Sequence, residues 1–365
     1  MKTFLFALGH PAHYHLFKNI ANMLKTDGHK VIFVITPKDI LENLMILNNE
    51  EYSVLAKKKV NENILSKITK VIFSTKSLCK IVKSQNVDLL IGCLPQIAYC
   101  GKVLSIPSIF VGEDDFSITW MQGIITYPFA NHILAPSSTN VNPFSFKKIA
   151  YLGYNELTYL HPNHFIPNKA IVEKYFSTVK PYFILRFAQL NAYHDLGVNA
   201  INTQTAQKLV DILNPYGDIY ITSERELEPQ FEQYRIKINP LDMHHVMAFA
   251  SLYIGDSQTM AAEAGVLGTP FVRFNDFVGK IGYLKELEDV YKLGFGIKTS
   301  EVSKLYSTIE ELLQMANRRK IFQNRRATML SDKIDCSAFF TWFIENYPES
   351  KRILKADPDY QLNFK

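Results

Sequence analysis

The chain has 365 residues, 47% of them hydrophobic and 21% charged, which is ordinary for a globular protein and long enough for two domains with sizeable cores. Its net charge of +5 is mildly basic and favours anionic ligands or a membrane surface. No block of Lys and Arg interleaved with aromatic residues points to nucleic acid, so we expect no nucleic-acid partner.

The four cysteines show no Cys-x-x-Cys spacing of the kind that binds metal; they are Cys79, Cys93, Cys100 and Cys336. No apolar run reaches the ~18 residues of a membrane span. The apolar N-terminus is too short for a signal peptide and is better explained as a first buried strand. We therefore expect a soluble, reduced protein in the cytoplasm, with the inner face of the membrane as an alternative site.

The N-terminal part predicts a βαβ unit, with strands at residues 3–8 and 30–36 and a helix between them. Three histidines follow the first strand, at the edge of the sheet where ligands bind. His10 and His13 are candidates for a catalytic base and a phosphate donor, because imidazole titrates near neutrality. A polar helix start with chance histidines is the alternative. The loop lacks a nearby carboxylate, so we expect no metal.

Further along, buried strands are predicted at residues 87–93 and 106–111. The second of these is followed by three consecutive acids, Glu113, Asp114 and Asp115. Clustered carboxylates raise one another's pKa, which suits a proton-transfer group. Glu113 and Asp114 are the catalytic candidates, and an ordinary acidic loop is the alternative.

The C-terminal part predicts strands at residues 182–187 and 218–222. Arg186 lies at the end of the first strand, and Ser223 and Arg225 follow the second. An arginine at such an edge can bind a diphosphate through two hydrogen bonds. These three residues, together with His244 near the start of a later helix, are candidates for binding an anionic donor.

The most informative segment is residues 252–274, which predicts a strand, a polar turn, a short helix and a second strand. Gly268 ends the helix and Pro270 prevents its continuation. The N-terminus of such a helix attracts phosphate. Candidate donor-binding residues here are Ser257, Gln258, Thr259 and Met260, with Glu263 one turn later to accept hydrogen bonds from a ribose diol. An N-cap serine and an exposed polar glutamate are the alternative.

The run Gly-Asp-Ser-Gln-Thr-Met-Ala-Ala-Glu-Ala-Gly-Val-Leu-Gly-Thr-Pro resembles the donor-nucleotide segment of GT-B glycosyltransferases and of UDP-N-acetylglucosamine 2-epimerases. It is most similar to a GT-B-like family that is still classed as a domain of unknown function. Further positions match that family's pattern: Pro11, His13, His15, Phe17, Gly153, Tyr154, Glu156, Arg186, Tyr193 and His194. Asp256, Ser257 and Gln258 replace most of the family's glycines.

UDP-N-acetylglucosamine 2-epimerases carry an aspartate after the strand that corresponds to residues 87–93 of this chain. This chain has Gly92, Cys93 and Leu94 there, which disfavours epimerisation.

The resemblance implies an α/β fold of two Rossmann-like domains in the GT-B architecture with an interdomain cleft. The boundaries are an N-terminal acceptor domain (1–160), a linker (161–180), a nucleotide-sugar domain (181–335), and a C-terminal helix and tail (336–365) that crosses back to the first domain. His13, Glu113, Arg186 and Ser257 would then line one cleft.

The implied activity is metal-independent transfer of a sugar from a nucleotide-sugar, with UDP as the expected nucleotide, to a glycan or lipid-linked acceptor in surface-polysaccharide assembly. The nucleotide-sugar is a substrate, and no cofactor is expected. A UDP-sugar 2-epimerase-like enzyme and a non-catalytic nucleotide-sugar binder are the alternatives. Peripheral membrane association and a homodimer are further expectations.

Overall fold

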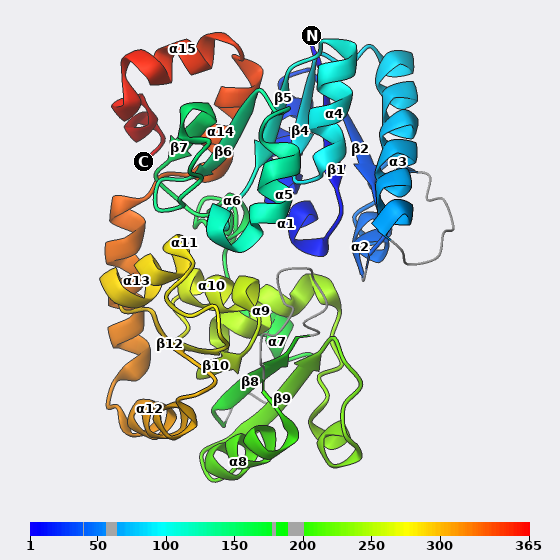
Figure 1. Ribbon diagram of the computed structural model, residues 1–365. Helices are drawn as coiled ribbons and strands as arrows, with labels where there is room; N and C mark the ends of the chain where they lie inside the picture. The colour runs from blue at the N-terminus through cyan, green and yellow to red at the C-terminus, as the bar shows by residue number, and fades with distance from the viewer. Residues whose placement is uncertain (39, 56–63, 177–179, 189–200) are drawn as a thin grey trace. The chain divides into compact units, whose positions relative to one another are not determined.

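The computed structural model describes residues 1–38, 40–55, 64–176, 180–188 and 201–365. The chain divides into two compact units (Figure 1). The first unit comprises Met1–His164 together with Ile334–Lys365, and the second comprises Phe165–Lys333. The C-terminal residues therefore belong to the same unit as the N-terminus.

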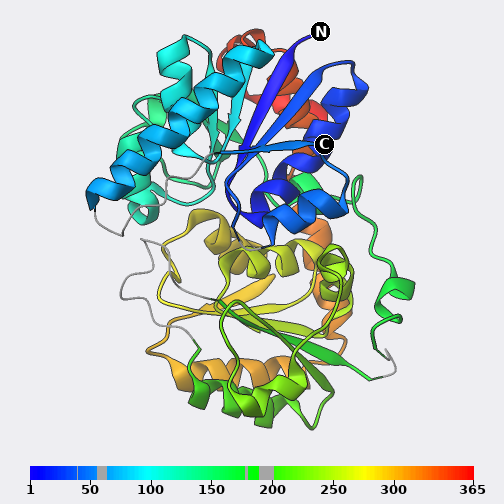
Figure 2. The same cartoon turned by 90° about the vertical axis from the view of Figure 1, so that its right-hand side faces the viewer.

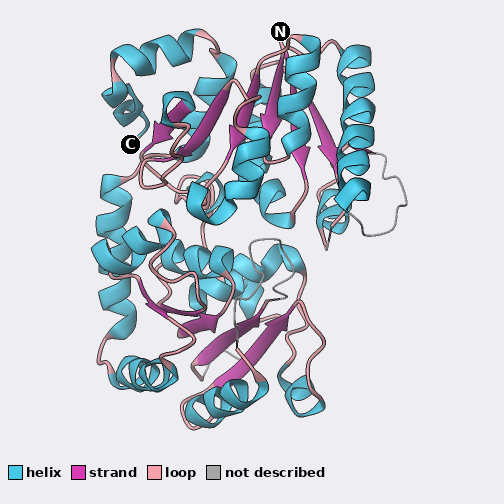
Figure 3. Cartoon of the chain, viewed as in Figure 1, coloured by secondary structure: helices cyan, strands magenta, loops and turns pink. Residues whose placement is uncertain are grey.

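The first unit is built on a seven-stranded parallel sheet with the strand order β3-β2-β1-β4-β5-β6-β7 (Figure 3). Its strands β1, β4 and β5 are buried along their whole length, as expected where helices cover both faces of a parallel sheet. The strands are β1 (Thr3–Leu8), β2 (Lys30–Ile35), β3 (Tyr52–Val54), β4 (Leu89–Gly92), β5 (Ser108–Val111), β6 (His132–Pro136) and β7 (Lys148–Tyr151).

Helices cover both faces of this sheet, and Figure 2 shows α1 on one side with α3 and α4 on the other. Right-handed crossovers account for this arrangement, because the strand order runs one way from β1 to β3 and the other way from β4 to β7. The helices are α1 (Pro11–Thr26), α2 (Leu41–Leu47), α3 (Ile64–Gln85), α4 (Pro95–Leu104), α5 (Phe116–Thr126), η1 (Ser145–Lys147) and α6 (Leu157–Leu160).

The C-terminal segment of the first unit contains α14 (Cys336–Glu345), α15 (Glu349–Ala356) and η6 (Pro358–Phe364). Helix α14 packs against α1 and α6. Asn19 of α1 and Ser337 of α14 both donate hydrogen bonds to the carbonyl of Thr158. The chain end thus completes the hydrophobic covering of the first sheet.

The second unit has a five-stranded parallel sheet with the order β12-β11-β10-β8-β9. Its strands are β8 (Tyr182–Phe187), β9 (Asp218–Ser223), β10 (Leu252–Gly255), β11 (Phe271–Phe274) and β12 (Gly294–Ile297). Its helices are α7 (Lys169–Val172), α8 (Thr203–Leu213), η3 (Pro229–Tyr234), η4 (Pro240–Asp242), α9 (Met243–Phe249), α10 (Gln258–Leu267), α11 (Gly282–Lys285), η5 (Glu286–Val290), α12 (Val302–Gln314) and α13 (Arg318–Asp332).

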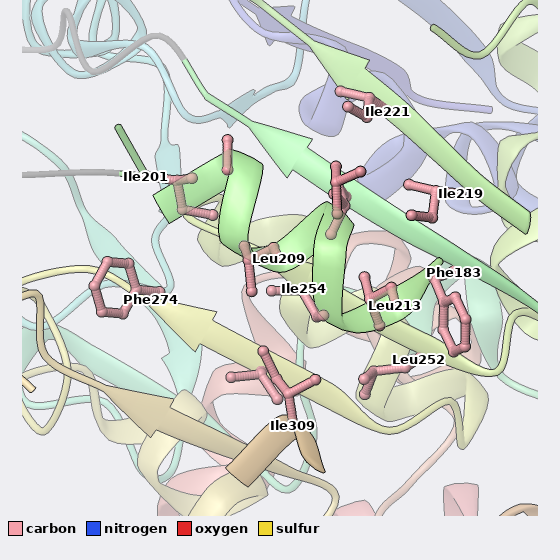
Figure 4. Packing of buried hydrophobic residues seen from close by; sticks show 14 of the residues in the cluster. Phe183, Ile201, Leu209, Leu213, Ile219, Ile221, Leu252, Ile254, Phe274 and Ile309 are labelled. Carbon is pink, nitrogen blue, oxygen red and sulfur yellow. The ribbon is translucent and has the colours of Figure 1, made fainter. Parts of the chain in front are cut away.

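Apolar side chains from the strands and from α8 and α12 form the core of the second unit (Figure 4). Phe183 and Ile254 from the sheet pack with Leu209 of α8 and Ile309 of α12, and all four side chains are buried. In helix α8 the apolar residues recur at helical spacing, so they lie on one side of the helix, and that side packs on the sheet.

In each sheet the chain reverses its direction of winding between two neighbouring strands, β1 and β4 in the first and β8 and β10 in the second. Open α/β sheets bind ligands beyond the carboxyl ends of such strands. At each of these two positions one strand ends in a glycine: Gly92 ends β4, and Gly255 ends β10. A Cβ on Gly92 would lie 2.4 Å from the carbonyl oxygen of Ala7, and one on Gly255 would lie 2.8 Å from Cβ of Arg186.

The α/β class with two Rossmann-like units is confirmed. Residues 161–180, expected as a linker, include α7 and the first boundary between the units, at His164 and Phe165. Within the described ranges, no helix combines the length and the apolar character needed to span a bilayer.

Candidate functional site

Two arginines lie at the carboxyl edge of the second sheet, at the ends of the adjacent strands β8 and β9. Arg186 Nη1 donates a hydrogen bond to Thr222 Oγ1 at 2.8 Å, and Arg186 Nη2 contacts Glu224. Arg225 Nη2 donates to the carbonyl oxygen of Ile201 at 2.5 Å, and its guanidinium lies 5.2 Å from the ring centre of Phe187. Both arginines are thus held in place by their outer nitrogens.

The Nε atoms of these two arginines differ from the Nη atoms in their hydrogen bonding. The Nε atoms of Arg186 and Arg225 are buried and have no hydrogen-bond partner among the residues that the structure describes. Gln258 Oε1, at the start of α10, is in the same condition. A buried polar group without a partner costs about 1–3 kcal/mol, so a concentration of such groups at one sheet edge indicates a site built for a polar ligand.

The N-terminus of α10 lies at the same edge. Ser257 is the N-cap, and its Oγ accepts a hydrogen bond from the N–H of Met260 at 3.5 Å. Ser257, Gln258, Thr259 and Met260 are all partly exposed. Because the first N–H groups of a helix lack intrahelical acceptors, this terminus presents donors and a partial positive charge.

Asp256 holds this edge together, a role that the sequence analysis did not assign. Its carboxylate accepts hydrogen bonds from the N–H groups of Ala188, at 2.6 Å, and Ile201, at 3.4 Å. Burial raises the pKa of Asp256 to about 6, although both N–H groups favour its charged form. Asn275 donates to the carbonyl of Asp256 at 2.9 Å. The bonds from Ala188 and Ile201 to Asp256 join segments that are far apart in the chain, so no local sequence pattern indicates them.

Glu263 is not accessible, and the expectation that it is exposed in a cleft is wrong. Its side chain is 5% exposed and lies 3.0 Å from Nε2 of His244, which is equally buried. Helix α10 consists largely of small and apolar residues and is buried from Ala261 to Leu267, so its one acid is enclosed with it. The structure therefore pairs two of the candidate donor-binding residues with each other.

Ser223 has a local structural role. Its Oγ donates to the carbonyl of Arg225 at 2.7 Å and accepts from the N–H of Arg225 at 3.2 Å. This turn orients Arg225, so Ser223 supports the site through the arginine.

In the first unit, His10 and His13 lie at the end of β1 and in the first turn of α1. Nδ1 of His10 accepts a hydrogen bond from the N–H of Ala12 at 3.2 Å, and Nδ1 of His13 accepts from the N–H of Gly9 at 3.1 Å. A backbone N–H only donates, so each neutral imidazole carries its proton on Nε2. In this geometry both side chains present an Nε2–H donor, which favours hydrogen-bond donation over the role of a base.

The pKa of His13 supports this assignment. Burial lowers the pKa of His13 to about 3, and the electrostatic influence of His10 and Lys38 adds to the decrease. His13 is therefore neutral at physiological pH and cannot exchange a proton there. In the neutral form, its Nε2–H can still donate a hydrogen bond.

Glu113 follows β5 at the same edge. Its Oε1 accepts a hydrogen bond from the N–H of Asn155 at 2.9 Å, and its carbonyl accepts one from Thr139 at 2.6 Å. Burial raises the pKa of Glu113 to about 8 against the opposing bond from Asn155, and the charge of Asp114 adds to the increase. Such a carboxyl group releases its proton near neutrality, as a general base requires.

Cys93, at the end of β4, lies between these histidines and Glu113 along the edge of the sheet. Burial and the charge of Glu113 raise the pKa of its thiol, so Cys93 is neutral. The edge thus combines two imidazole donors, a neutral thiol and a carboxyl group with a raised pKa. Among the described parts of the chain, no three His, Cys, Asp or Glu side chains converge as metal ligands.

Solved structures that resemble this chain over most of its length include an epimerase and two glycosyl-transferring proteins. A UDP-GlcNAc 2-epimerase from Neisseria meningitidis bound to UDP-GlcNAc is 13% identical, with a TM-score of 0.59 over 90% of this chain and 99% of that chain. A glycotransferase of kitacinnamycin is 10% identical, with a TM-score of 0.65 over 94% and 98%. The spinosyn rhamnosyltransferase SpnG complexed with thymidine diphosphate is 12% identical, with a TM-score of 0.62 over 95% and 100%.

At these identities the likeness shows the fold alone, which is the GT-B fold. A family model described as "Protein of unknown function (DUF354)" matches residues 5–327, and the chain belongs to this family. A comparison with curated proteins gives no significant match. Tyr193 and His194, two positions that resemble the family pattern, lie outside the described residues.

Proposed function

We propose that this protein is a glycosyltransferase that uses a nucleotide-sugar donor bound by the second unit. The observation that carries the proposal is the pair of buried Nε atoms of Arg186 and Arg225, next to the N-terminus of α10. Two guanidinium groups and a helix N-terminus at one sheet edge are suited to a diphosphate. The charge that develops on the leaving diphosphate would be stabilised by the same groups.

The first unit would supply the acceptor side of the reaction. Glu113, with Asp114 beside it, would remove the proton from an acceptor hydroxyl. The Nε2–H groups of His10 and His13 would bind oxygens of the acceptor or of the transferred sugar. The reaction would need no metal, because arginines and helix N–H groups would neutralise the diphosphate.

The residue that follows β4, Cys93, favours glycosyl transfer over epimerisation. Cys93 is neutral there, so this position provides no carboxylate beside the sugar ring. Thymidine diphosphate in one structure of the same fold and UDP-GlcNAc in another leave the base to be decided by experiment. UDP is our first choice, and a glycan or lipid-linked acceptor of surface-polysaccharide assembly in the cytoplasm is the proposed setting.

The test has two stages. Calorimetric titration with UDP, TDP and GDP should give one diphosphate that binds at micromolar concentration. NMR of the matching nucleotide-sugar, incubated with the protein alone, should then show no epimer and at most slow hydrolysis. Accumulation of the epimer without an acceptor would identify an epimerase instead. Failure of all three diphosphates to bind would contradict the proposed donor site.

A further inference from the structure

Three helices cover one face of the first sheet, and they are devoid of acidic residues. Helices α3, α4 and α5 lie in front of the sheet in Figure 1. Gln96 of α4 donates a hydrogen bond to Ser74 of α3 at 3.0 Å, and Tyr99 of α4 donates to the carbonyl of Ile125 in α5 at 2.6 Å. Helices α3 and α4 contain lysines, and none of the three helices contains Asp or Glu.

Helix α5 exposes a group of large apolar side chains, which we call the α5 patch. The patch consists of Trp120 (51% exposed), Met121 (37%), Ile124 (50%), Ile125 (47%) and, just beyond the helix, Phe129 (43%). Residues four apart lie on the same side of a helix, so the four helical members share one face. A contiguous exposed apolar patch of this kind marks an interaction surface.

The buried side of α5 carries Gly123 and Thr126, and the ring of Phe116, which precedes a kink at Thr119, packs over Gly123. Phe116 lies 6.2 Å from Tyr127 between ring centres, and both rings pack against Phe144. Phe129 is held at the edge of the patch by an edge-to-face contact with Tyr99, at 5.3 Å. The α5 patch is therefore a fixed outward surface, and turning the helix inward would disrupt this aromatic cluster.

Exposed lysines lie on the same three-helix face as the patch. Lys76, Lys80 and Lys83 of α3 and Lys102 of α4 are exposed. From Phe116 to Leu152 the only charged residues are Lys147 and Lys148. Lys102 lies close enough to Lys147 to contribute, after burial, to lowering its pKa, which places Lys102 near the end of α5. The face thus combines exposed apolar side chains with positive charge.

We propose that the α5 patch docks on a lipid bilayer that contains anionic lipids. Tryptophan, phenylalanine and aliphatic side chains enter the boundary between headgroups and acyl chains, while lysines bind anionic headgroups. The aliphatic members of the patch offer no stacking surface for bases, which disfavours nucleic acid. A second copy would bring another cationic face against this one. The proposal does not depend on the proposed reaction.

Tryptophan fluorescence tests the docking directly, because the chain has two tryptophans, Trp120 and Trp342. In the variant Trp342→Phe, emission reports on Trp120 alone. Adding vesicles of phosphatidylcholine with phosphatidylglycerol should shift the emission to shorter wavelength, and the protein should float with the vesicles. Vesicles of phosphatidylcholine alone should give a smaller effect, and high salt should weaken the binding. An unchanged spectrum with every vesicle would overturn the proposal.

A matched pair of double variants distinguishes binding through the α5 patch from nonspecific hydrophobic binding. Ile124→Ser/Ile125→Ser should reduce vesicle binding by about tenfold or more, since two exposed apolar side chains are lost. Ile40→Ser/Ile46→Ser is the control, because these isoleucines are equally exposed but lie at α2. Equal binding by both double variants would contradict the proposal. The proposal would also be contradicted if the protein formed dimers without vesicles, or bound RNA, and only Ile124→Ser/Ile125→Ser abolished that binding.

Discussion

His244 and Glu263 form a buried pair that joins α9 to α10, with 3.0 Å between Nε2 of His244 and Oε1 of Glu263. Each residue is 5% exposed, so water cannot replace either partner. The pair fixes the orientation of the helix whose N-terminus belongs to the proposed diphosphate site. Its effect on ligand binding would therefore include positioning α10.

The first prediction is that Glu263→Gln lowers the free energy of unfolding by about 1–3 kcal/mol, because a buried charge-assisted hydrogen bond is weakened. Urea denaturation of both proteins measures the change. Glu310→Gln is the control, since Glu310 is exposed on α12 and its replacement should alter stability by no more than about 0.5 kcal/mol. Equal stability of wild type and Glu263→Gln would show that the pair contributes nothing to the fold.

The second prediction concerns Arg225. Replacing it with Gln should weaken binding of the cognate nucleoside diphosphate by about 1.5–3 kcal/mol, roughly one to two decades, because a charge-assisted hydrogen bond is lost. Arg235→Gln is the matched control, because Arg235 forms a surface pair with Glu232 in the same unit. Calorimetric titration provides both affinities. Identical losses in the two variants would mean that general positive charge, and not a site at Arg225, attracts the ligand.

The elements that were predictable from the sequence are those set by short-range patterns. Alternating apolar strands and amphipathic helices indicated the two α/β units, and the rule that ligands bind at carboxyl edges placed Arg186 and Ser257 together. Helix α10 shows the limit. It has apolar or small residues on nearly every side, so spacing alone could not distinguish a buried Glu263 from an exposed one.

Other parts of the site depend on contacts between distant segments. Asp256 binds N–H groups of Ala188 and Ile201, which precede it in the chain by 68 and 55 residues. Its raised pKa follows from burial in the folded state. The protonation of His10 and His13 is an intermediate case, because each ring accepts from an N–H within four residues. That geometry requires the backbone conformation as well as the sequence.

A third prediction concerns Asp335, the N-cap of α14. Its carboxylate lies 2.8 Å from Nε2 of His164 and accepts a bond from Asn163 at 2.9 Å. Burial alone would raise the pKa of Asp335, but bonds from His164, from the N–H of Ala338 and from Asn163 outweigh it and hold the pKa at about 2. The charged carboxylate therefore stabilises the fold above the unfolded pKa of about 4.

This contribution is lost as pH falls through about 2, where the folded carboxyl takes up its proton. Asp335→Asn should thus lower stability by about 1–2 kcal/mol at pH 7, and the difference from wild type should shrink below pH 4. Thermal denaturation from pH 2 to 7 measures it. Asp359→Asn, at an exposed position of η6, should show no such trend. A difference that stays constant with pH would indicate a packing effect of the substitution.

The last prediction assigns the proton-transfer group. Burial raises the pKa of Glu113 to about 8, whereas burial lowers that of His13 to about 3. If Glu113 is the base, kcat/KM should rise tenfold per pH unit below about 8 and level off above it. Were His13 the base, no change would fall between pH 5 and 9. Glu113→Gln should retain donor binding but lose kcat by about two to four decades.

Stability provides an independent check on Glu113, because it requires no knowledge of the acceptor. A carboxyl group whose folded pKa is raised favours folding fully below its unfolded pKa, near 4.5, and loses that contribution as pH rises through about 8. Wild type should therefore lose stability between pH 5 and 8.5 relative to Glu113→Gln, whose amide keeps the size of the group without a titrating proton. Glu51→Gln, at an exposed acid of the same unit, is the control. Parallel stability curves for wild type and Glu113→Gln would mean that the pKa of Glu113 is not raised by folding, and they would contradict its assignment as a base tuned to neutral pH.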